Sequence, residues 1–213
     1  MRRLILFDID GTLISDGGAS RQAFDSALSA VYDYRGDLKK YDFSGRTDPQ
    51  IAHMVLEDFG LTSQQIDERI AQLWRLYLEN LAKNTTAERV RILPGIEPLL
   101  VALSGRHDVV LALLTGNLEP GARLKLGAPN LNRYFRFGAF GSDSPKREEL
   151  PPIAVERASA SEGHRFAGRD VVIIGDSIYD VRCGVPHDAT TIAVASGKTS
   201  GHRLRAEDPH HFF

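Results

Sequence analysis

Apolar and polar positions follow two different patterns along the chain. Short apolar runs that end at a small or polar residue occur at the start and in the second half, and such runs are typical of strands buried on both faces of a parallel sheet. They lie at residues 4–7, 109–114, 135–140, 171–174 and 190–194. Segments with helical spacing separate the later runs, at 96–103, 119–126 and 150–160. Strands that alternate with helices predict an α/β fold, with a Rossmann-like, doubly wound parallel sheet that carries helices on both faces.

The second pattern fills residues 20–84, where helix follows helix and no strand is indicated. Thr47-Asp48-Pro49 is typical of a helix start, because a capping side chain precedes a proline in the first turn. Thr62-Ser63-Gln64-Gln65 matches a capping box, and it begins a further apolar stripe that continues to Leu81.

This helical block interrupts the α/β alternation directly after the first strand. At 213 residues, the chain is long enough for one good core and an inserted subdomain. We therefore expect a helical cap of residues 16–87, inserted into an α/β core made of residues 1–15 and 88–213.

The composition is that of a globular protein, with 25% charged and 42% hydrophobic residues. A net charge of −2 provides no broad field that would favour nucleic acid or a membrane surface as a partner. The apolar run before Asp8 is too short for a secretory signal, and no run is long enough to span a bilayer. The single cysteine, Cys183, excludes an internal disulfide. We expect a cytoplasmic protein that is a monomer or a homodimer.

Candidate chemistry lies where the predicted strands end. Asp8 and Asp10 follow the first strand, Thr115 follows the second, and Asp176 follows the strand at 171–174. Parallel strands place these ends at one edge of the sheet, so the side chains converge. Three carboxylates in one cleft repel each other unless a cation lies between them, and oxygen ligands without nearby His or Cys favour Mg²⁺.

The same cleft has the groups that phosphate chemistry needs. A carboxylate can attack phosphorus and form an aspartyl-phosphate. Thr115 offers a hydroxyl, and the amides that follow it, at Gly116 and Asn117, can hold phosphate oxygens near a helix start. A cation at Lys146 or Arg147 would hold the transferring group and offset its charge.

Taken in order, these residues resemble the four signature motifs of the haloacid dehalogenase (HAD) superfamily. The matching segments are Asp8-Ile9-Asp10-Gly11-Thr12, the strand that ends in Thr115, the basic pair at 146–147, and Gly175-Asp176-Ser177-Ile178-Tyr179-Asp180. The helical block is similar to the C1-type cap of phosphoglycolate-phosphatase-like members. The resemblance implies a Mg²⁺-dependent phosphatase that hydrolyses a small phosphorylated metabolite through an aspartyl-phosphate.

The resemblance also implies a role for each matching residue. Asp8 would be the nucleophile, and Asp10 the general acid and base that phosphatases and phosphomutases have and dehalogenases lack. Thr115 would bind phosphate. Asp176 would complete the Mg²⁺ site together with Asp8 and the main-chain carbonyl of Asp10, while Asp180 would support the fourth motif from behind.

Two positions depart from the family pattern or lie outside it. The third motif usually shows Lys followed by Pro, and counting back from Pro152 places Arg147, rather than Lys146, nearest the usual lysine position. Arginine can bind two phosphate oxygens at once, so the exchange is chemically workable. Arg46, just before a cap helix, either contacts an anionic group of the substrate or is a solvated loop residue.

Other interpretations remain open at this stage. A phosphomutase of the β-phosphoglucomutase type would use the same four motifs, and a non-catalytic HAD-like binding module would need neither the nucleophile nor its acid. Ser196-Gly197-Lys198-Thr199 lacks the first glycine of a nucleotide P-loop, because that position is Ile192. We expect it to be a loop beside the active site. His210-His211 is expected to lie in a solvated tail.

Overall fold

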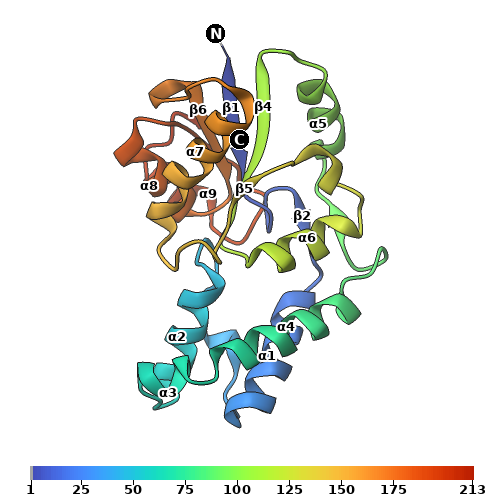
Figure 1. Cartoon of the computed structure of the whole chain (residues 1–213), viewed down its shortest axis with the longest axis vertical. Coiled ribbons are helices and arrows are strands. Elements are labelled where there is room, and N and C mark those ends of the chain that lie inside the picture. The colour runs from blue at the N-terminus through green and yellow to red at the C-terminus, as the bar shows by residue number, and fades with distance from the viewer. Residues whose placement is uncertain (1) are drawn as a thin grey trace.

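A computed structural model describes residues 2–213 (Figure 1). It contains a parallel sheet of six strands in the order β5-β4-β1-β6-β7-β8. The chain begins with the central strand β1, and the later strands add on either side of it. The strands are β1 (Arg3–Phe7), β4 (Val109–Leu114), β5 (Gly138–Ala139), β6 (Val171–Gly175), β7 (Thr190–Ala193) and β8 (His211–Phe212). β1 pairs in parallel with both β4 and β6, which brings the ends of these three strands together.

Helices cover both faces of this sheet, as the sequence predicts. The core helices are α5 (Ile96–Ser104), α6 (Glu119–Gly127), α7 (Leu150–Glu162), α8 (Ile178–Gly184) and α9 (Gly201–Arg205). Alternate residues of β1 point to opposite faces. Leu4 and Leu6 pack in one buried cluster with residues of α7, whereas Ile5 and Phe7 pack in another with residues of α5 and α6. The fold is thus the expected doubly wound α/β sheet.

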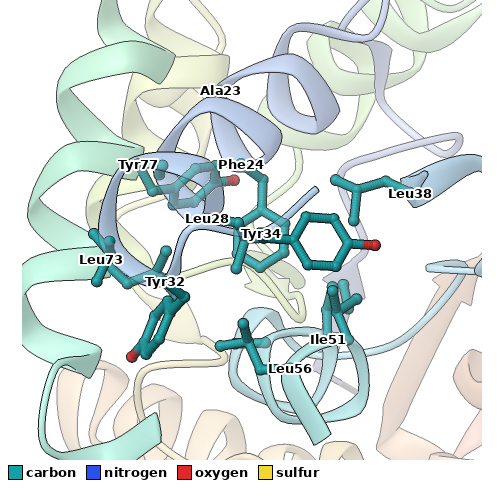
Figure 2. Close-up of a cluster of buried hydrophobic side chains, with 14 of the residues drawn as sticks. Ala23, Phe24, Leu28, Tyr32, Tyr34, Leu38, Ile51, Leu56, Leu73 and Tyr77 are labelled. Carbon is teal, nitrogen blue, oxygen red and sulfur yellow. The ribbon is translucent and has the colours of Figure 1, made fainter. Parts of the chain in front are cut away.

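The block between residues 20 and 84 contains no strand in the structure. Its helices are α1 (Ala19–Tyr32), α2 (Asp48–Asp58), α3 (Ser63–Asp67) and α4 (Ile70–Asn84). They enclose a buried cluster, to which Leu118 of the core also belongs, and Phe24, Leu28 and Tyr34 lie near the middle of the drawn side chains (Figure 2). The division into a cap of residues 16–87 and a core of residues 1–15 and 88–213 stays a proposal, and it is supported by this cluster, because nearly all of its buried residues come from the helical block.

The two connections between the helical block and the core lie side by side. β2 (Ile14–Ser15) pairs antiparallel with β3 (Arg91–Ile92) and forms a small second sheet. The block also rests on α6, because α4 packs closely against Gly121, where a Cβ atom would lie 3.4 Å from the side chain of Leu81.

Local capping follows the sequence closely. Thr47 and Thr62 both form complete capping boxes, with Gln50 and Gln65 as the reciprocal partners. The apolar stripe that begins at Thr62 is nevertheless broken into α3 and α4. Arg69 lies at the break with a non-helical backbone (φ −122°, ψ 5°), and its side chain donates a hydrogen bond to the carbonyl oxygen of Val31 on α1 (2.8 Å).

Two further expectations are corrected. The third strand is much shorter than residues 135–140, because Phe135 belongs to a 3-10 turn that its amide closes onto Asn132. The C-terminal segment is a strand rather than a tail, since β8 pairs with β7 and the Nδ1 atom of His210 accepts a hydrogen bond from the Thr191 amide (3.0 Å). His210 and His211 are nevertheless exposed to solvent, as expected. No helix within residues 2–213 has the length and apolar character needed to cross a bilayer.

Candidate active site

A cavity of about 360 Å³ lies at the carboxyl edge of the sheet, between the core and the helical block. It brings together residues that are distant in the sequence. Its lining includes every residue assigned to the site from the sequence, namely Asp8, Asp10, Arg46, Thr115, Gly116, Asn117, Arg147 and Asp176. The loop that contains Gly197 and Lys198 also lines the cavity, as expected.

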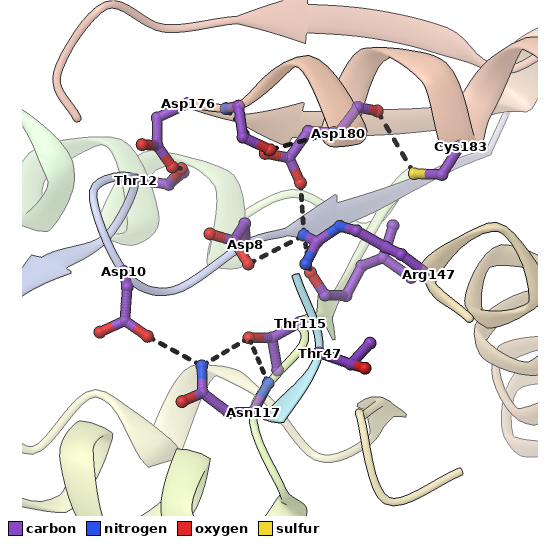
Figure 3. A network of polar contacts seen from close by, with 12 residues as sticks. Asp8, Asp10, Thr12, Thr47, Thr115, Asn117, Arg147, Asp176, Asp180 and Cys183 are labelled. Atoms are coloured by element: carbon purple, nitrogen blue, oxygen red, sulfur yellow. Dashed lines mark hydrogen bonds and ion pairs between the residues drawn. The ribbon is translucent and has the colours of Figure 1, made fainter. Parts of the chain in front are cut away.

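A cluster of buried carboxylates lies at this cavity (Figure 3), and two of its members, Asp8 and Asp176, line it. Asp8, Asp176 and Asp180 each place an oxygen within 4.8 Å of the others. Burial raises the pKa of Asp8 to about 7, although the charge of Arg147 opposes the shift. Burial, together with repulsion from Asp8, raises the pKa of Asp176 to about 8. When its carboxyl groups are ionised, the cluster therefore has more negative charge than Arg147 compensates.

Arg147 is the cation that the protein itself supplies to this cluster. It begins the 3-10 turn before α7 and is only 3% exposed. Its NH2 group donates to the Oδ1 atom of Asp8 (3.0 Å) and also to Asp180. Lys146, by contrast, has a side chain that is 63% exposed and pairs with Glu149 on the surface. Of the two basic residues considered, Arg147 is the one in the cleft.

The carboxylate cluster fits a metal site. The oxygens in it that are still available to bind a metal belong to Asp8 and Asp176. Asp180 uses one oxygen for Arg147 and the other for the amide and hydroxyl of Ser177, at 2.9 and 2.6 Å. Asp8 retains its Oδ2 atom, and Asp176 accepts only a long bond of 3.3 Å from the Thr12 hydroxyl. A hard divalent cation such as Mg²⁺ prefers oxygen donors of this kind. Asp8 and Asp176 would hold it, and Asp180 would brace Arg147.

The carboxylate of Asp10 lies apart from this cluster. Its Oδ2 atom accepts hydrogen bonds from the Nδ2 atom of Asn117 (2.8 Å) and from the Nζ atom of Lys125 (2.7 Å). A metal contact from Asp10 would therefore use its main-chain carbonyl, as the family resemblance implies, and this contact stays a prediction. Thr115 accepts from the same Asn117 side chain (2.8 Å), which leaves its hydroxyl proton free to donate.

Sequence reasoning did not identify Lys125, which lies on α6 and is 2% exposed. A signal was present, because the buried face of this helix also carries Ala122 and Leu126, and a lysine at that spacing needs an anionic partner. From the sequence, Asp48 is indicated only as part of a helix start. Burial raises its pKa to about 6, against the opposing charge of Lys125.

The loop before α2 seats the helical block on the core. Three hydrogen bonds join the two parts: Thr47 Oγ1 to the carbonyl of Pro145 (2.6 Å), the Asp48 amide to the carbonyl of Gly116 (2.7 Å), and the Leu118 amide to Asp48 Oδ2 (2.8 Å). Gly116 is required by the contact, because a Cβ atom there would lie 2.1 Å from the carbonyl oxygen of Arg46.

The fold and the site together define a class of protein. A doubly wound sheet carries a buried carboxylate cluster at the end of its first strand, and a helical insertion covers it. The family model for haloacid dehalogenase-like hydrolases matches residues 5–184. The chain belongs to this family and is a hydrolase.

Individual relatives are distant. The chain is 25% identical over 211 residues to a phosphoglycolate phosphatase of Pseudomonas fluorescens, an alignment that covers 97% of this chain and 74% of the relative. It is 26% identical to a 5′-nucleotidase of Pseudomonas aeruginosa, covering 98% of this chain and 89% of the other. A solved structure, the "predicted phosphatase" of Clostridium acetobutylicum, has the same fold with a TM-score of 0.75, 21% identity, and coverage of 100% and 93%.

Magnesium is expected to stabilise the protein more strongly as the pH rises. Because the pKa values of Asp8 and Asp176 are raised, the metal-free folded state binds more protons than the unfolded chain. The stability of the metal-free protein therefore falls as the pH rises from about 4, the ordinary carboxyl pKa, through the folded-state pKa values of about 7 and 8. A cation held by Asp8 and Asp176 would displace those protons. Its apparent affinity should rise by up to about tenfold per pH unit for each proton released.

Thermal unfolding with Mg²⁺ or with a chelator, at about pH 6 and about pH 8, measures this linkage. The rise in Tm on adding Mg²⁺ should be larger at the higher pH, and the chelator should remove it. An Asp176→Asn variant serves as the control and should lose the effect. Equal Mg²⁺ stabilisation at both pH values would contradict the expected proton release.

Proposed function

We propose that this protein is a Mg²⁺-dependent phosphatase that hydrolyses a small, phosphoglycolate-like phosphomonoester through an aspartyl-phosphate. The observation that carries the proposal is the pair of carboxylates after β1. Asp8 is buried against Arg147 with its Oδ2 atom available, while Asp10 lines the same cavity with a side chain that is 40% exposed. Phosphoglycolate phosphatases among the relatives support the substrate class.

The proposed reaction has two steps. Asp8 Oδ2 attacks phosphorus, a bond from this oxygen to phosphorus forms, and the bond from phosphorus to the leaving oxygen breaks. Asp10 donates a proton to the leaving oxygen. Water then attacks the phosphorus of the aspartyl-phosphate, Asp10 takes its proton, and phosphate and free Asp8 result. General acid–base assistance of this kind typically contributes about 10²–10⁴-fold.

The remaining groups hold the reactants. Arg147 fixes Asp8 through its Oδ1 atom, so that Oδ2 faces the cavity. The Thr115 hydroxyl and the amides of Gly116 and Asn117 would bind the phosphoryl oxygens. When bound, Mg²⁺ supplies positive charge for the phosphoryl oxygens and offsets the repulsion between the carboxylates.

Arg46 is proposed to bind an anionic group on the leaving side of the substrate. It lines the cavity from the loop before α2, and its guanidinium lies 5.4 Å from the centre of the Tyr179 ring. Within residues 2–213 it forms no ion pair, so its charge is available to a ligand. A carboxylate, as in phosphoglycolate, has the charge and geometry that arginine binds well.

A substrate screen tests the proposal. Phosphoglycolate, sugar phosphates, nucleoside monophosphates and p-nitrophenyl phosphate are incubated with enzyme and Mg²⁺, and both inorganic phosphate and isomerised sugar phosphate are measured. We expect phosphate release, with phosphoglycolate among the better substrates. Isomerisation without phosphate release would indicate a mutase, and failure to turn over any ester would reject catalysis.

Variants at Arg46 test the anion contact separately. Arg46→Ala should raise the KM for phosphoglycolate by about tenfold, since a charged hydrogen bond is lost, and should change the KM for p-nitrophenyl phosphate far less. Arg75→Ala is a matched control, because Arg75 lies in the same helical block and pairs with Glu79 on the surface. An equal change for both esters would argue against a contact with the anionic group.

A further inference from the structure

Lys125 is a buried cation that the proposed mechanism does not use. It projects from α6 into the cavity, and its side chain is only 2% exposed. Burial alone would lower the pKa of Lys125, but the charges of Asp10, Asp16 and Asp48 reverse the effect and raise it, so the ammonium stays charged. Placing such a charge inside the protein is costly unless partners compensate it.

Its partners form a closed ring. The Nζ atom of Lys125 donates to Asp10 Oδ2 (2.7 Å) and to Asn117 Oδ1 (2.6 Å). Asn117 closes the ring through its Nδ2 atom, which donates to the same Asp10 oxygen (2.8 Å). Two donors on one oxygen hold the carboxylate in a single orientation.

The other oxygen of Asp10 is the one left for chemistry. Among residues 2–213, every hydrogen bond to the Asp10 side chain ends on Oδ2, and the side chain remains 40% exposed where it lines the cavity. Oδ1 is therefore the atom that can reach a leaving group or a water molecule. Its direction depends on the anchor at Oδ2, because the carboxylate is planar and turns as a unit.

The two reactive carboxylates thus have separate cations. Arg147 contacts Asp8, and Lys125 contacts Asp10. Neither cation substitutes for the other, because they are buried on different sides of β1. Arg147 lies on the segment before α7, and Lys125 lies on α6.

We propose that Lys125 is a positioning residue that aims the Asp10 carboxylate at the leaving-group oxygen, an inference that rests on the proposed phosphatase function. Lys125 itself transfers no proton. If Asp10 is misplaced by about 1 Å, the reaction rate should fall by about 10²-fold, which lies within the range that general acid–base catalysis contributes to a rate. Esters with a poor leaving group depend on this orientation of Asp10 for phosphoenzyme formation, because their leaving oxygen must be protonated, and activated esters do not.

The test compares two esters in Lys125→Met, first in the wild type and then in an Asp10→Asn background. With phosphoglycolate, an alkyl ester with a poor leaving group, kcat/KM, which reports formation of the phosphoenzyme, should fall by about 10–100-fold, and with p-nitrophenyl phosphate by no more than about threefold. In the Asp10→Asn background, Lys125→Met should change neither rate by more than about twofold, because the two residues act as one unit. Intact mass after brief exposure to the aryl ester should show phosphoenzyme in both single variants.

Controls separate positioning from folding. Arg123→Met removes a cation from the same helix that bonds Glu119 and the carbonyl of Phe135, and it should leave the ratio of the two activities unchanged. Lys125→Arg retains the buried charge but displaces the donor atoms. It should therefore lose more activity with phosphoglycolate than with p-nitrophenyl phosphate, by a smaller factor than Lys125→Met. This variant keeps the test available even if Lys125→Met does not fold.

Three results would overturn the inference. Equal losses of kcat/KM with both esters, or losses of kcat/KM that multiply fully with those of Asp10→Asn, would show that Lys125 acts only through the fold, while the proposed phosphatase function would stand. A wild-type protein without Mg²⁺-dependent turnover of either ester would reject that function and the inference together.

Discussion

Replacing Asp8 with asparagine should abolish ester turnover and leave the protein as stable as the wild type or more so. Loss of the nucleophile removes the covalent route, so the rate should fall by at least about 10⁴-fold. Stability should not fall with it, because burial raises the pKa of Asp8 and an ionised carboxylate at this position therefore destabilises the fold above about pH 7. Arg147 keeps Asp180 as its partner.

Intact mass after brief exposure to p-nitrophenyl phosphate distinguishes the two aspartates. Asp8→Asn should carry no phosphoryl group, whereas Asp10→Asn, the matched variant two residues along, should accumulate phosphoenzyme because hydrolysis lacks its base. Thermal unfolding at about pH 8 gives the stability comparison. A phosphoryl adduct on Asp8→Asn, or a large drop in its Tm, would show that Asp8 has been assigned the wrong role.

Replacing Arg147 with methionine should have the largest effect on stability. The substitution leaves Asp8 and Asp180 buried without their shared cation, and breaking a buried ion pair in this way lowers the free energy of unfolding by about 3–5 kcal/mol. The loss should grow with pH, because ionisation of the unpaired carboxylates becomes more costly. Arg147→Lys should retain most of the stability but lose about 10–100-fold in activity, since one ammonium cannot hold both carboxylates in the same geometry.

Urea unfolding at about pH 5 and about pH 8 measures these differences. Lys146→Met, one residue away on the surface, is the control and should change the free energy of unfolding by less than about 0.5 kcal/mol. If Arg147→Met were as stable as that control, the buried ion pairs would contribute nothing, and their role would have to be one of specificity alone.

The sequence predicted most of the sheet and most of the cleft, for a simple reason. A strand buried on both faces is an uninterrupted apolar run, and its end is marked by the first polar residue, as at Asp8, Thr115 and Asp176. Because parallel strands share an edge, identifying the strands also identified which polar residues meet. The capping boxes at Thr47 and Thr62 could also be predicted from the sequence, since each is a local pattern within one turn.

Features that depend on tertiary contacts were not predicted. The position of Lys125 on the apolar face of its helix indicates burial but does not identify Asp10 as its partner, and Asp48 looks like a helix start until the loop before α2 is placed beside Leu118. The break between α3 and α4 has no helix breaker in the sequence, and at this break the Arg69 side chain makes a tertiary contact with the carbonyl oxygen of Val31. The short strand β8 pairs over only two residues, too few to give an alternating pattern.

The antiparallel pairing of β2 with β3 has a consequence for how such chains can change. These two strands have the geometry of a hairpin, and everything between Ser15 and Arg91 is in effect its loop. Because the entropy of closing a loop grows only with the logarithm of its length, the core is affected little by whether that loop has a few residues or several dozen. The entropy of closing this hairpin therefore leaves the length of the helical block free to vary, and the hydrogen bonds of Thr47 and Asp48 to Pro145, Gly116 and Leu118 are what fit this particular block to the core.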